Sequence, residues 1–163
     1  MIINGTDLSG LIKIRQINRQ LAPSIENLIF DIPGSHGVYH IKNLRKQRRI
    51  EVDFVIIGES VADRIEKARA LAGILASQND LTIILPDDPQ KMYIGSLSGD
   101  TDLEEIMHLA SGTISFICSD PYALDVSTQS ASFGTNSILT VSNTGTAETY
   151  PVFEITFNAP TTF

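Results

Sequence analysis

Tryptophan is absent from this 163-residue sequence, and cysteine occurs once, at Cys118. A single cysteine cannot form an internal disulfide, and it cannot supply the several thiolates of a cysteine-rich zinc site. We therefore interpret Cys118 as a lone buried thiol, the usual environment of an unpaired cysteine. The missing tryptophan also counts against a sugar-binding surface, because such surfaces favour exposed aromatic side chains.

Long hydrophobic runs are missing as well. The longest apolar stretches extend only a few residues, as at Val55–Ile57, whereas a membrane-spanning helix needs roughly 20. The N-terminus lacks the basic start, apolar middle and small-residue cleavage site of a secretion signal. We therefore expect no membrane partner, and we expect synthesis in a cytoplasm.

Positive charge is confined to the first part of the chain. All 12 Lys and Arg residues lie at or before Lys91, together with 11 of the 19 Asp and Glu residues, so this part is almost neutral. The other 8 acidic residues follow Lys91 without any basic residue among them. Domains that bind nucleic acid usually carry an overall positive excess. We therefore expect no specific nucleic-acid partner.

What the sequence contains is mainly the patterning of strands. Residues 12–20 alternate apolar and polar side chains, which predicts a strand with one wet face. Turn-forming residues at 22–37 surround a short apolar segment and indicate an irregular loop or a hairpin. Ile50–Ile57 begins with strict alternation and ends wholly apolar, which predicts a central strand of a sheet.

One helix is predicted after this strand. Ser60 and Asp63 resemble a capping box, with Asp in place of the usual Glu. Charged residues, Arg64 among them, lie mostly off the apolar stripe that follows. The stripe recurs at helical spacing and is expected to pack on a sheet through Val61, Ile65, Ala68, Ala72 and Leu75.

Further strands are predicted in the second half of the chain, at Leu81–Leu85, Lys91–Ser98 and Gly112–Cys118. Asp100–His108 is ambiguous, because its apolar residues also fit a helix. Beyond about Ser127 the composition changes to Ser, Thr, Asn and Gly, with two more strand candidates at 137–141 and 150–157.

These elements together predict an α+β fold. We expect a mostly antiparallel β-sheet or split β-barrel with one packed α-helix and an extended hairpin, followed by the start of a second β domain. The main domain is expected to end near residue 126, because roughly 30 further residues are too few for an independent domain.

Five segments carry a resemblance to a known family. They are Arg49–Phe54, Ala62–Arg64, Leu85–Pro89 with the later Tyr93, Gly112–Tyr122 and Tyr150–Ile155. The most specific is Gly112–Tyr122, where a strand ends in Asp-Pro-Tyr. The first four segments resemble the N-terminal domain of the siphophage distal tail (Dit) proteins, a family of phage tail components. The last resembles an opening strand of the galectin-like C-terminal domain of that family.

The resemblance implies an architectural function and no enzymatic activity. Proteins of this family form hexameric rings at the distal end of the tail tube and join the tube to the tip proteins that meet the host. The implied location is the virion tail tip, after synthesis in the bacterial host cytoplasm. The implied partners are other copies of the chain, the tail tube protein and a tail-tip or tail-associated lysin-like protein.

The resemblance also implies a domain organisation. Residues 1–126 would form the ring-forming N-terminal tail domain. Residues 127–163 would be a linker and the first strands of a galectin-like β domain, so the chain is expected to be a truncated member of the family. An alternative function is a carbohydrate-binding module of a host-attachment device, because Ser-, Thr- and Asn-rich segments after residue 127 would suit a lectin-like sandwich.

Three groups of polar residues invite a chemical interpretation, and each has a simpler one. His36 and His40 have the spacing of paired metal ligands on a helix, but the glycines around them favour a loop or strand. Asp87 and Asp88 lie between two prolines and fit a turn. Asp100–Glu105 begins like a calcium loop but lacks its glycine and its final bidentate Glu. We predict no catalytic residue, no metal and no cofactor.

Two charged runs of opposite sign are the candidate site. The basic run is Lys42, Arg45, Lys46, Arg48 and Arg49, and the acidic run is Asp100, Asp102, Glu104 and Glu105. In a head-to-tail ring these runs can meet between neighbouring subunits, whereas a two-fold contact through the basic run would set like charges together. We predict an inter-subunit contact. The alternatives for the basic run are a solvated hairpin tip and a nucleic-acid contact, the latter without an aromatic platform.

Overall fold

The computed structural model of the chain describes residues 1–77, 79–132, 134 and 138–154. The chain divides into two units, Met1–Thr128 and Gln129–Phe163, and each is described by itself. Within the described ranges, no helix has the length and apolar character that crossing a membrane requires.

The first unit contains a single helix, α1, which spans Val61–Leu75. The strands that precede it are β1 (Ile2–Ile3), β2 (Thr6–Asp7), β3 (Lys13–Arg19), β4 (Ile25–Asp31), β5 (Val38–Arg45) and β6 (Arg48–Ile57). The strands that follow it are β7 (Leu81–Ile84), β8 (Lys91–Leu97), β9 (Leu103–Ile106), β10 (Leu109–Cys118) and β11 (Leu124–Asp125).

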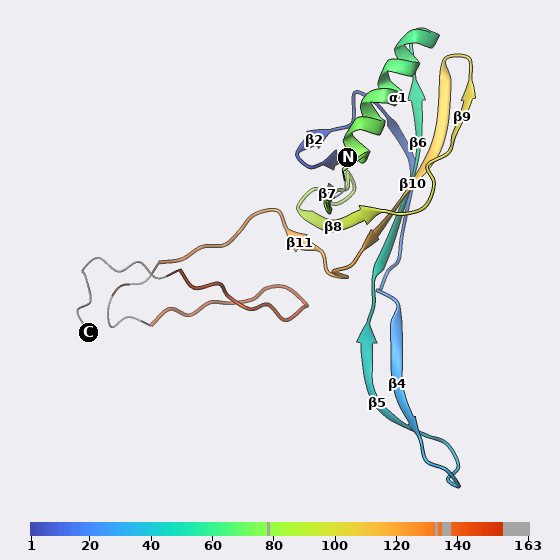
Figure 1. Cartoon of the computed structure of the whole chain (residues 1–163). Coiled ribbons are helices and arrows are strands. Elements are labelled where there is room, and N and C mark those ends of the chain that lie inside the picture. Colours follow the sequence, from blue (N-terminus) through green and yellow to red (C-terminus); the bar gives the residue numbers. More distant parts are fainter. Residues whose placement is uncertain (78, 133, 135–137, 155–163) are drawn as a thin grey trace, which may run out of the picture. The chain divides into compact units, whose positions relative to one another are not determined.

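Nine of these strands form one antiparallel sheet, and β4 and β5 form a separate two-stranded hairpin (Figure 1). The order in the large sheet is β2-β1-β7-β8-β10-β6-β3, with β11 paired to β8 and β9 paired to β10. β2 and β3 end this order without pairing to each other, so the sheet is not a closed barrel. The predicted α+β fold, mostly antiparallel with one helix, is confirmed.

The centre of the sheet is the long β6–β10 pair, which is in register from Leu109 opposite Ile57 to Cys118 opposite Arg48. β6 also pairs with β3, so the predicted central strand is confirmed. Alternate side chains of β6 point into the core, where Val52 and Ile56 are both 0% exposed. The other fully buried large residues include Ile3, Leu8, Ile50, Phe54, Leu81, Ile83, Leu85, Ile114 and Phe116.

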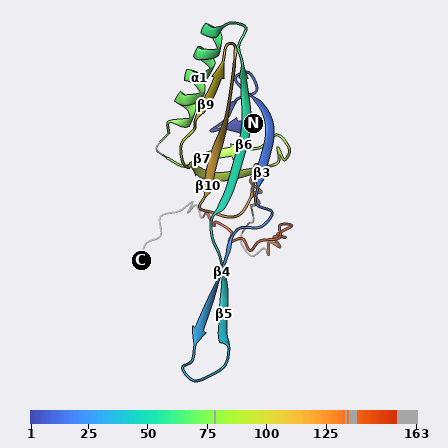
Figure 2. The same ribbon diagram turned by 90° about the vertical axis from the view of Figure 1, so that its right-hand side faces the viewer.

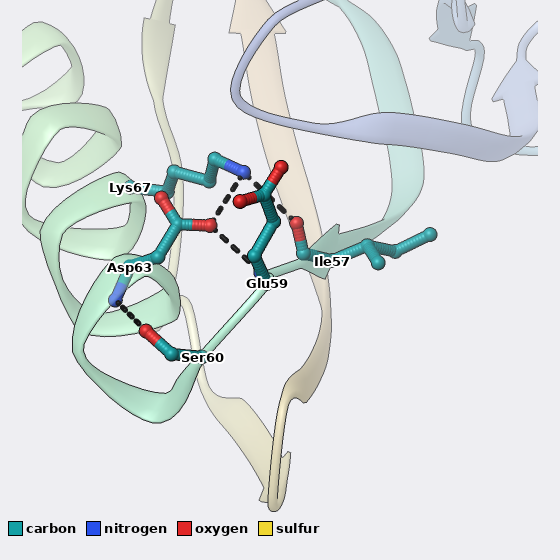
Figure 3. Close-up of polar contacts among 5 residues, drawn as sticks. All are labelled: Ile57, Glu59, Ser60, Asp63 and Lys67. Carbon is teal, nitrogen blue, oxygen red and sulfur yellow. Dashed lines mark hydrogen bonds and ion pairs between the residues drawn. The ribbon is translucent and has the colours of Figure 1, made fainter.

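The start of α1 is fixed by a small polar network (Figure 3). Ser60 is the N-cap, and its hydroxyl accepts a hydrogen bond of 3.2 Å from the Asp63 amide. The Asp63 carboxylate in turn accepts from the Glu59 amide at 2.8 Å, one residue earlier than in a standard capping box. Lys67 Nζ donates both to that carboxylate, at 2.9 Å, and to the Ile57 carbonyl at the end of β6, at 3.0 Å. The helix start is therefore tied to the central strand.

The apolar stripe of α1 differs from the predicted one. The residues that α1 buries are Arg64, Leu71 and Leu75, whereas Val61 is 45% exposed and Ala72 is also exposed. The predicted stripe is confirmed at Leu75, which is buried, and at Ala68, which packs against the core. It was wrong at Val61 and Ala72, and it placed Arg64 off the buried face. Arg64 is only 5% exposed. Its guanidinium forms an ion pair with Glu105 of β9, and a burial that depends on a distant carboxylate leaves no trace in helical periodicity.

Two glycines allow close packing in the middle of the sheet. A Cβ on Gly95 of β8 would lie 2.7 Å from the Ile117 carbonyl oxygen and 2.9 Å from the Cys118 sulfur. A Cβ on Gly112 of β10 would lie 2.7 Å from the Asp102 carbonyl oxygen. Both positions need glycine because neighbouring backbone approaches where a side chain would start.

The ambiguous segment Asp100–His108 is not helical. Leu103–Ile106 forms β9, which pairs with the first four residues of β10. Met107 and His108 make the turn between these strands, and Met107 adopts a positive φ of 50°. The strands predicted at Leu81–Leu85, Lys91–Ser98 and Gly112–Cys118 are confirmed as β7, β8 and β10, within a few residues at their ends.

The second unit has neither helix nor strand in its described residues, 129–132, 134 and 138–154. The strands predicted at 137–141 and 150–157 lie partly outside these ranges, and the predictions are wrong for 138–141 and 150–154. A strand needs a hydrogen-bonded neighbour, and Ile138 and Val152 are 96% and 95% exposed. The local structure is a turn in which the Asn143 side chain accepts from the Gly145 amide at 2.8 Å and donates to the Ala147 carbonyl at 2.7 Å.

Candidate assembly surface

The hairpin of β4 and β5 extends away from the large sheet in both views (Figures 1 and 2). The two strands are paired from Ile25 opposite Arg45 to Asp31 opposite Val38, with a register shift after Leu28. Turn formers at 32–37 close the tip, where Gly34 and Gly37 adopt φ of +83° and +87°. The predicted extended hairpin is therefore present.

Exposed apolar side chains dominate this hairpin. Every residue of β4 is exposed, and β5 is exposed except at Leu44. Phe30 and Tyr39, which lie opposite each other, are 58% and 65% exposed. An isolated two-stranded hairpin is only marginally stable in water, and a contiguous exposed apolar patch usually marks an interaction surface. The hairpin is therefore the strongest candidate for an assembly surface.

The two faces of the hairpin differ. Side chains directly opposite across an antiparallel pair share a face, so Phe30 and Tyr39 lie together, with Leu28 two residues away on the same side. We call this side the apolar face and define it by Leu28, Phe30, Tyr39 and Leu44, which share it with Lys42 opposite Leu28 and Glu26 opposite Leu44. The other side, the mixed face, carries Ile25, Asn27, Ile29, Asp31, Val38, His40, Asn43 and Arg45. Only the apolar face has an unbroken row of large apolar groups towards the tip.

The basic run lies at the base of the hairpin, where β5 meets β6, and not at the tip. The interpretation as a solvated hairpin tip is therefore wrong. The guanidinium of Arg45 lies 5.5 Å from the ring centre of Tyr122 and donates to its hydroxyl at 3.0 Å. The guanidinium of Arg48 lies 5.6 Å from the ring centre of the buried Tyr93. Cation–π contacts of this kind hold both arginines within their own chain.

The remaining members of the basic run are divided between paired and free. Lys46 forms an ion pair with Glu26 across the hairpin base. The side chains of Lys42 and Arg49 are exposed and make no ion pair or hydrogen bond with any described residue. Lys42 and Arg49 are therefore the members of the run whose side chains have no described partner, whereas Arg45 and Arg48 keep their positive charges but are held in position by tyrosines.

Most of the acidic run lines one cavity. Asp100, Asp102 and Glu104 border a volume of about 650 Å³, together with Arg15 and Asp53. A register shift between β3 and β6 occurs at Arg15, as in a β-bulge, which can re-aim a side chain. None of the three run members has an ion-pair partner among the described residues, so the cavity keeps an excess of negative charge.

Glu105 differs from the rest of its run. Its carboxylate lies 2.7 Å from Arg64 of α1, and this contact lowers the pKa of Glu105 below its ordinary value. No ion pair joins the basic run to the acidic run within the described chain. Of the nine candidate residues, the five that stay available for another molecule are Lys42, Arg49, Asp100, Asp102 and Glu104.

The aromatic partners Tyr93 and Tyr122 were missed by sequence reasoning. Each lies more than forty positions from its arginine, so no local pattern links them. The available signal was that both tyrosines belong to segments that carried the family resemblance, Tyr93 after Leu85–Pro89 and Tyr122 at the end of the Asp-Pro-Tyr segment. The sequence showed no aromatic residue beside the basic run. In the folded chain, however, Tyr122 and Tyr93 lie next to Arg45 and Arg48, so the objection that the run lacks aromatic neighbours is wrong.

The other polar candidates are isolated. His36 lies in the hairpin tip, and His40 bonds to Asn43 on the same strand. Burial raises the pKa of the Cys118 thiol to about 11, which keeps it protonated at neutral pH. Within residues 1–77, 79–132, 134 and 138–154, no three His, Cys, Asp or Glu side chains are grouped closely enough to hold a metal ion.

Comparison with known proteins places this fold among phage tail components. A family model described as the phage tail protein RIFT-related domain matches residues 3–118. The distal tail protein of Bacillus phage SPP1 is 27% identical over 165 residues, an alignment that covers 99% of this chain and 64% of that protein. The chain therefore spans less than two thirds of the length of this relative.

Two solved structures share the fold. The crystal structure of SPP1 Dit, described as a paradigm of the hub adsorption apparatus in phages that infect Gram-positive bacteria, matches with a TM-score of 0.63 and 23% identity. The match covers 74% of this chain and 49% of that one. The baseplate of phage p2 in its activated conformation with Sr matches with a TM-score of 0.53 and 17% identity, over 69% of this chain and 38% of that one.

Proposed function

This chain belongs to the family of phage tail proteins with a RIFT-related domain, and from that premise we propose that it is a ring-forming structural component of the tail tip. The ring joins the tail tube to the host-adhesion device and contains six copies. Its partners are the tail tube protein and a tail-tip or tail-associated lysin-like protein. The function is architectural, without catalysis, and the location is the virion, after synthesis in the bacterial host cytoplasm.

The observation that carries this proposal is the apolar face of the hairpin. Phe30 and Tyr39 are more than half exposed, and nothing in the described part of the first unit covers them. Burying a large apolar side chain contributes about 1.5–3 kcal/mol, so a neighbour that covers this face would stabilise the assembly. Because the hairpin extends beyond its own sheet, it can reach a second copy of the chain.

The charges favour a head-to-tail arrangement. Lys42 lies opposite Leu28 on the apolar face itself, and Glu26 of the same face is already paired with Lys46, so two hairpins that met face to face around a two-fold axis would bring their lysines together. In a head-to-tail contact, Lys42 and Arg49 of one subunit instead approach the cavity bordered by Asp100, Asp102 and Glu104 of the next. Such a contact uses two different patches, which is the type that closes into rings.

The two ends of the chain have different parts in this proposal. Residues 1–126 form the ring domain. Residues 127–163 are a linker and the start of a galectin-like β domain, in which the described residues 138–154 form no strand by themselves. The alternative of a carbohydrate-binding module depended on those segments forming a sandwich, and their described residues contain no strand.

Light scattering over a series of protein concentrations tests the proposed assembly. We expect a mean mass that rises with concentration and levels off at six chains. A chain that stays monomeric at millimolar concentration, or that stops at a two-fold dimer, would contradict the proposal. A monomer that is retained by host glycans would instead support the carbohydrate-binding alternative.

The electrostatic part of the proposal has its own variants. We expect Lys42→Glu with Arg49→Glu to weaken assembly at low salt, and Asp102→Lys with Glu104→Lys in the same chain to restore it in part. The effect should fade at high salt, because exposed pairs contribute about 0–1 kcal/mol each and are screened over roughly 8 Å at physiological ionic strength. Lys13→Glu with Arg69→Glu makes the same change in net charge elsewhere and is the control. Equal weakening by both basic-to-acidic pairs would refute a specific contact.

A further inference from the structure

Two short segments without strand structure join the hairpin to the sheet, and they lie side by side. β3 and β4 are separated by residues 20–24, and β5 and β6 by residues 46–47. The two segments bond to each other, since the Lys46 amide donates to the Ser24 carbonyl at 2.8 Å and the Arg49 amide donates to the Gln20 side chain at 3.2 Å. The Gln20 amide also donates to the Arg49 carbonyl at 3.4 Å, and the Ser24 hydroxyl donates to the Gln47 carbonyl at 3.2 Å. Regular strand pairing is interrupted in both segments at this level, which is the geometry of a joint about which the hairpin can tilt as a unit.

Arg45 is the residue that connects the hairpin to the body across this joint. Its Nη1 donates to the Tyr122 hydroxyl at 3.0 Å, and its guanidinium stacks on the Tyr122 ring. Among the described residues, no other side chain of β4 or β5 forms a hydrogen bond or ion pair with the body beyond the joint. Apart from the hydrogen bonds within the joint, this contact is the polar side-chain interaction that opposes tilting of the hairpin.

Tyr122 belongs to residues 120–126, a segment that follows β10 and pairs with β8 through β11. We call it the exit segment. Its first turn is fixed by a 3.0 Å bond from the Tyr122 amide to the Asp120 carboxylate. Its end is fixed to β8, because Asp125 forms an ion pair of 2.9 Å with Lys91 and the Val126 amide donates to the Gln90 carbonyl at 3.0 Å. Tyr122 lies between these two anchored ends of the segment, which therefore determine where its ring lies.

We propose that the contact between Arg45 and Tyr122 is a latch that sets the angle of the hairpin and couples it to the exit segment. Arg45 lies on the mixed face of the hairpin, and the latch therefore holds that face against the exit segment and turns the apolar face away from it. A displacement of the exit segment moves Tyr122 and re-aims the apolar face. The latch is a conformational device in the monomer, and it goes beyond the ring function proposed above.

Electron-spin distance measurements on the dilute monomer test the latch. Labels are placed on the hairpin tip, through Ser35→Cys, and on an exposed position of α1, through Glu66→Cys. The buried thiol of Cys118 stays unlabelled at neutral pH, because its pKa is raised to about 11. We expect one narrow distance distribution in the parent and a clearly broader one in Arg45→Leu and in Tyr122→Leu.

Two further variants separate the latch from general destabilisation. Tyr122→Phe keeps the ring and loses the hydroxyl, so its distribution should have intermediate width. Tyr39→Leu changes an exposed hairpin tyrosine that has no arginine partner, and should leave the width unchanged. Hydrogen exchange of the β4 and β5 amides should accelerate roughly 2- to 5-fold in Tyr122→Leu, the factor expected for an exposed cation–π contact. Equal widths in the parent and Tyr122→Leu would overturn the proposal, as would equal broadening by Tyr39→Leu.

Coupling is tested by weakening the far anchor of the exit segment. Asp125→Lys replaces the ion pair with a like-charge contact beside Lys91, against the remaining pairing of β11 with β8, and should shift or broaden the hairpin distances in the parent. The same change in the Tyr122→Leu background should have no additional effect, because the hairpin is already released. An identical response in both backgrounds would show that the exit segment and the hairpin are independent. All of these measurements use the monomer, so their outcome does not depend on whether the ring proposal holds.

Discussion

The central sheet and the hairpin of this protein are both antiparallel and rich in large apolar residues. The sheet buries these residues, whereas the hairpin exposes them. Phe54 of β6 is 1% exposed, whereas Phe30 of β4 is 58% exposed. The sheet covers its own inner face with α1 and with strands from both ends of the first unit. The hairpin has no covering layer in the described part of the first unit, so its apolar residues are exposed there.

The difference shows that an apolar sequence pattern predicts which residues are stabilised by burial. The pattern does not show whether the same chain or another molecule buries them. Ordering the backbone costs about 1–2 kcal/mol per residue. In the sheet, burial of apolar side chains within the same chain offsets this cost. In the hairpin, part of the stabilising burial would come only from assembly with a partner. We therefore expect substitutions in the sheet to act on folding, and equivalent substitutions in the hairpin to act on association.

The largest expected contrast is between two phenylalanines. Phe116→Ala, in the fully buried centre of β10, should lower the free energy of unfolding by about 3–5 kcal/mol. Phe30→Ala, in the exposed hairpin, should change the free energy of unfolding of the monomer by no more than about 0.5 kcal/mol. Urea denaturation followed by circular dichroism measures both. Comparable losses would mean that the hairpin is covered within its own chain.

A smaller contrast concerns packing against backbone. Gly95→Ala should destabilise by about 1–3 kcal/mol, because the new Cβ meets the Ile117 carbonyl and the Cys118 sulfur. Gly73→Ala is the matched control, since a Cβ at Gly73 meets nothing within 4 Å and alanine in a helix is about 0.5–1 kcal/mol more favourable than glycine. Thermal unfolding should move down for the first and up for the second. A downward shift for both would refute the packing argument.

The helix start supplies a contrast of about 1 kcal/mol. Ser60→Ala removes the cap that satisfies the Asp63 amide, and such a loss costs about 1 kcal/mol. Ser35→Ala in the hairpin tip removes a side chain without a described partner and should change the free energy of unfolding by less than about 0.5 kcal/mol. Urea midpoints of the two variants decide between them. Stability unchanged by Ser60→Ala would show that the cap in Figure 3 contributes nothing.

The smallest expected effect depends on pH and belongs to the sheet. The hydrogen bond from Arg64 lowers the pKa of Glu105 below its ordinary value of 4.5, and the hydrogen bond from Lys67 lowers the pKa of Asp63 below its ordinary value of 3.8. Groups with a lowered folded pKa stabilise fully above the unfolded pKa and lose this contribution as pH falls through the folded pKa. Stability should therefore decline below about pH 4.5, and Glu105→Gln should make that decline shallower. An unchanged slope in urea midpoints between pH 6 and pH 3 would contradict the assignment.

Most of the fold could be predicted from local patterns. β6, β10 and the cap at Ser60 were predicted because alternation, strand-forming composition and capping chemistry act over a few residues. The burial of Arg64 could not be predicted, since it depends on Glu105 in a strand that lies more than thirty positions away. The strand at Leu103–Ile106 was ambiguous for a related reason, because four residues are too few to distinguish period 2 from period 3.6.

The candidate site was predicted in part. The charge split along the chain located two runs, but the sequence could not show that Arg45 and Arg48 are held by tyrosines or that Glu105 is held by Arg64. Those contacts join segments that the topology brings together. The apolar island at Leu28–Phe30 was visible in the sequence and was interpreted as part of a loop or hairpin. Its exposure, which carries the functional proposal, is a property of the folded chain alone.

The most direct test of the account compares two neighbouring hairpin residues on opposite faces. Phe30→Lys places a charge on the apolar face, and Ile29→Lys places the same charge on the mixed face. By sedimentation velocity over a concentration series, we expect Phe30→Lys to weaken association at least about tenfold, since losing the burial of a large side chain removes about 1.5–3 kcal/mol, and we expect Ile29→Lys to associate like the parent. Association of Phe30→Lys at parental strength, with both variants folded, would contradict the claim that the apolar face of the hairpin assembles this protein.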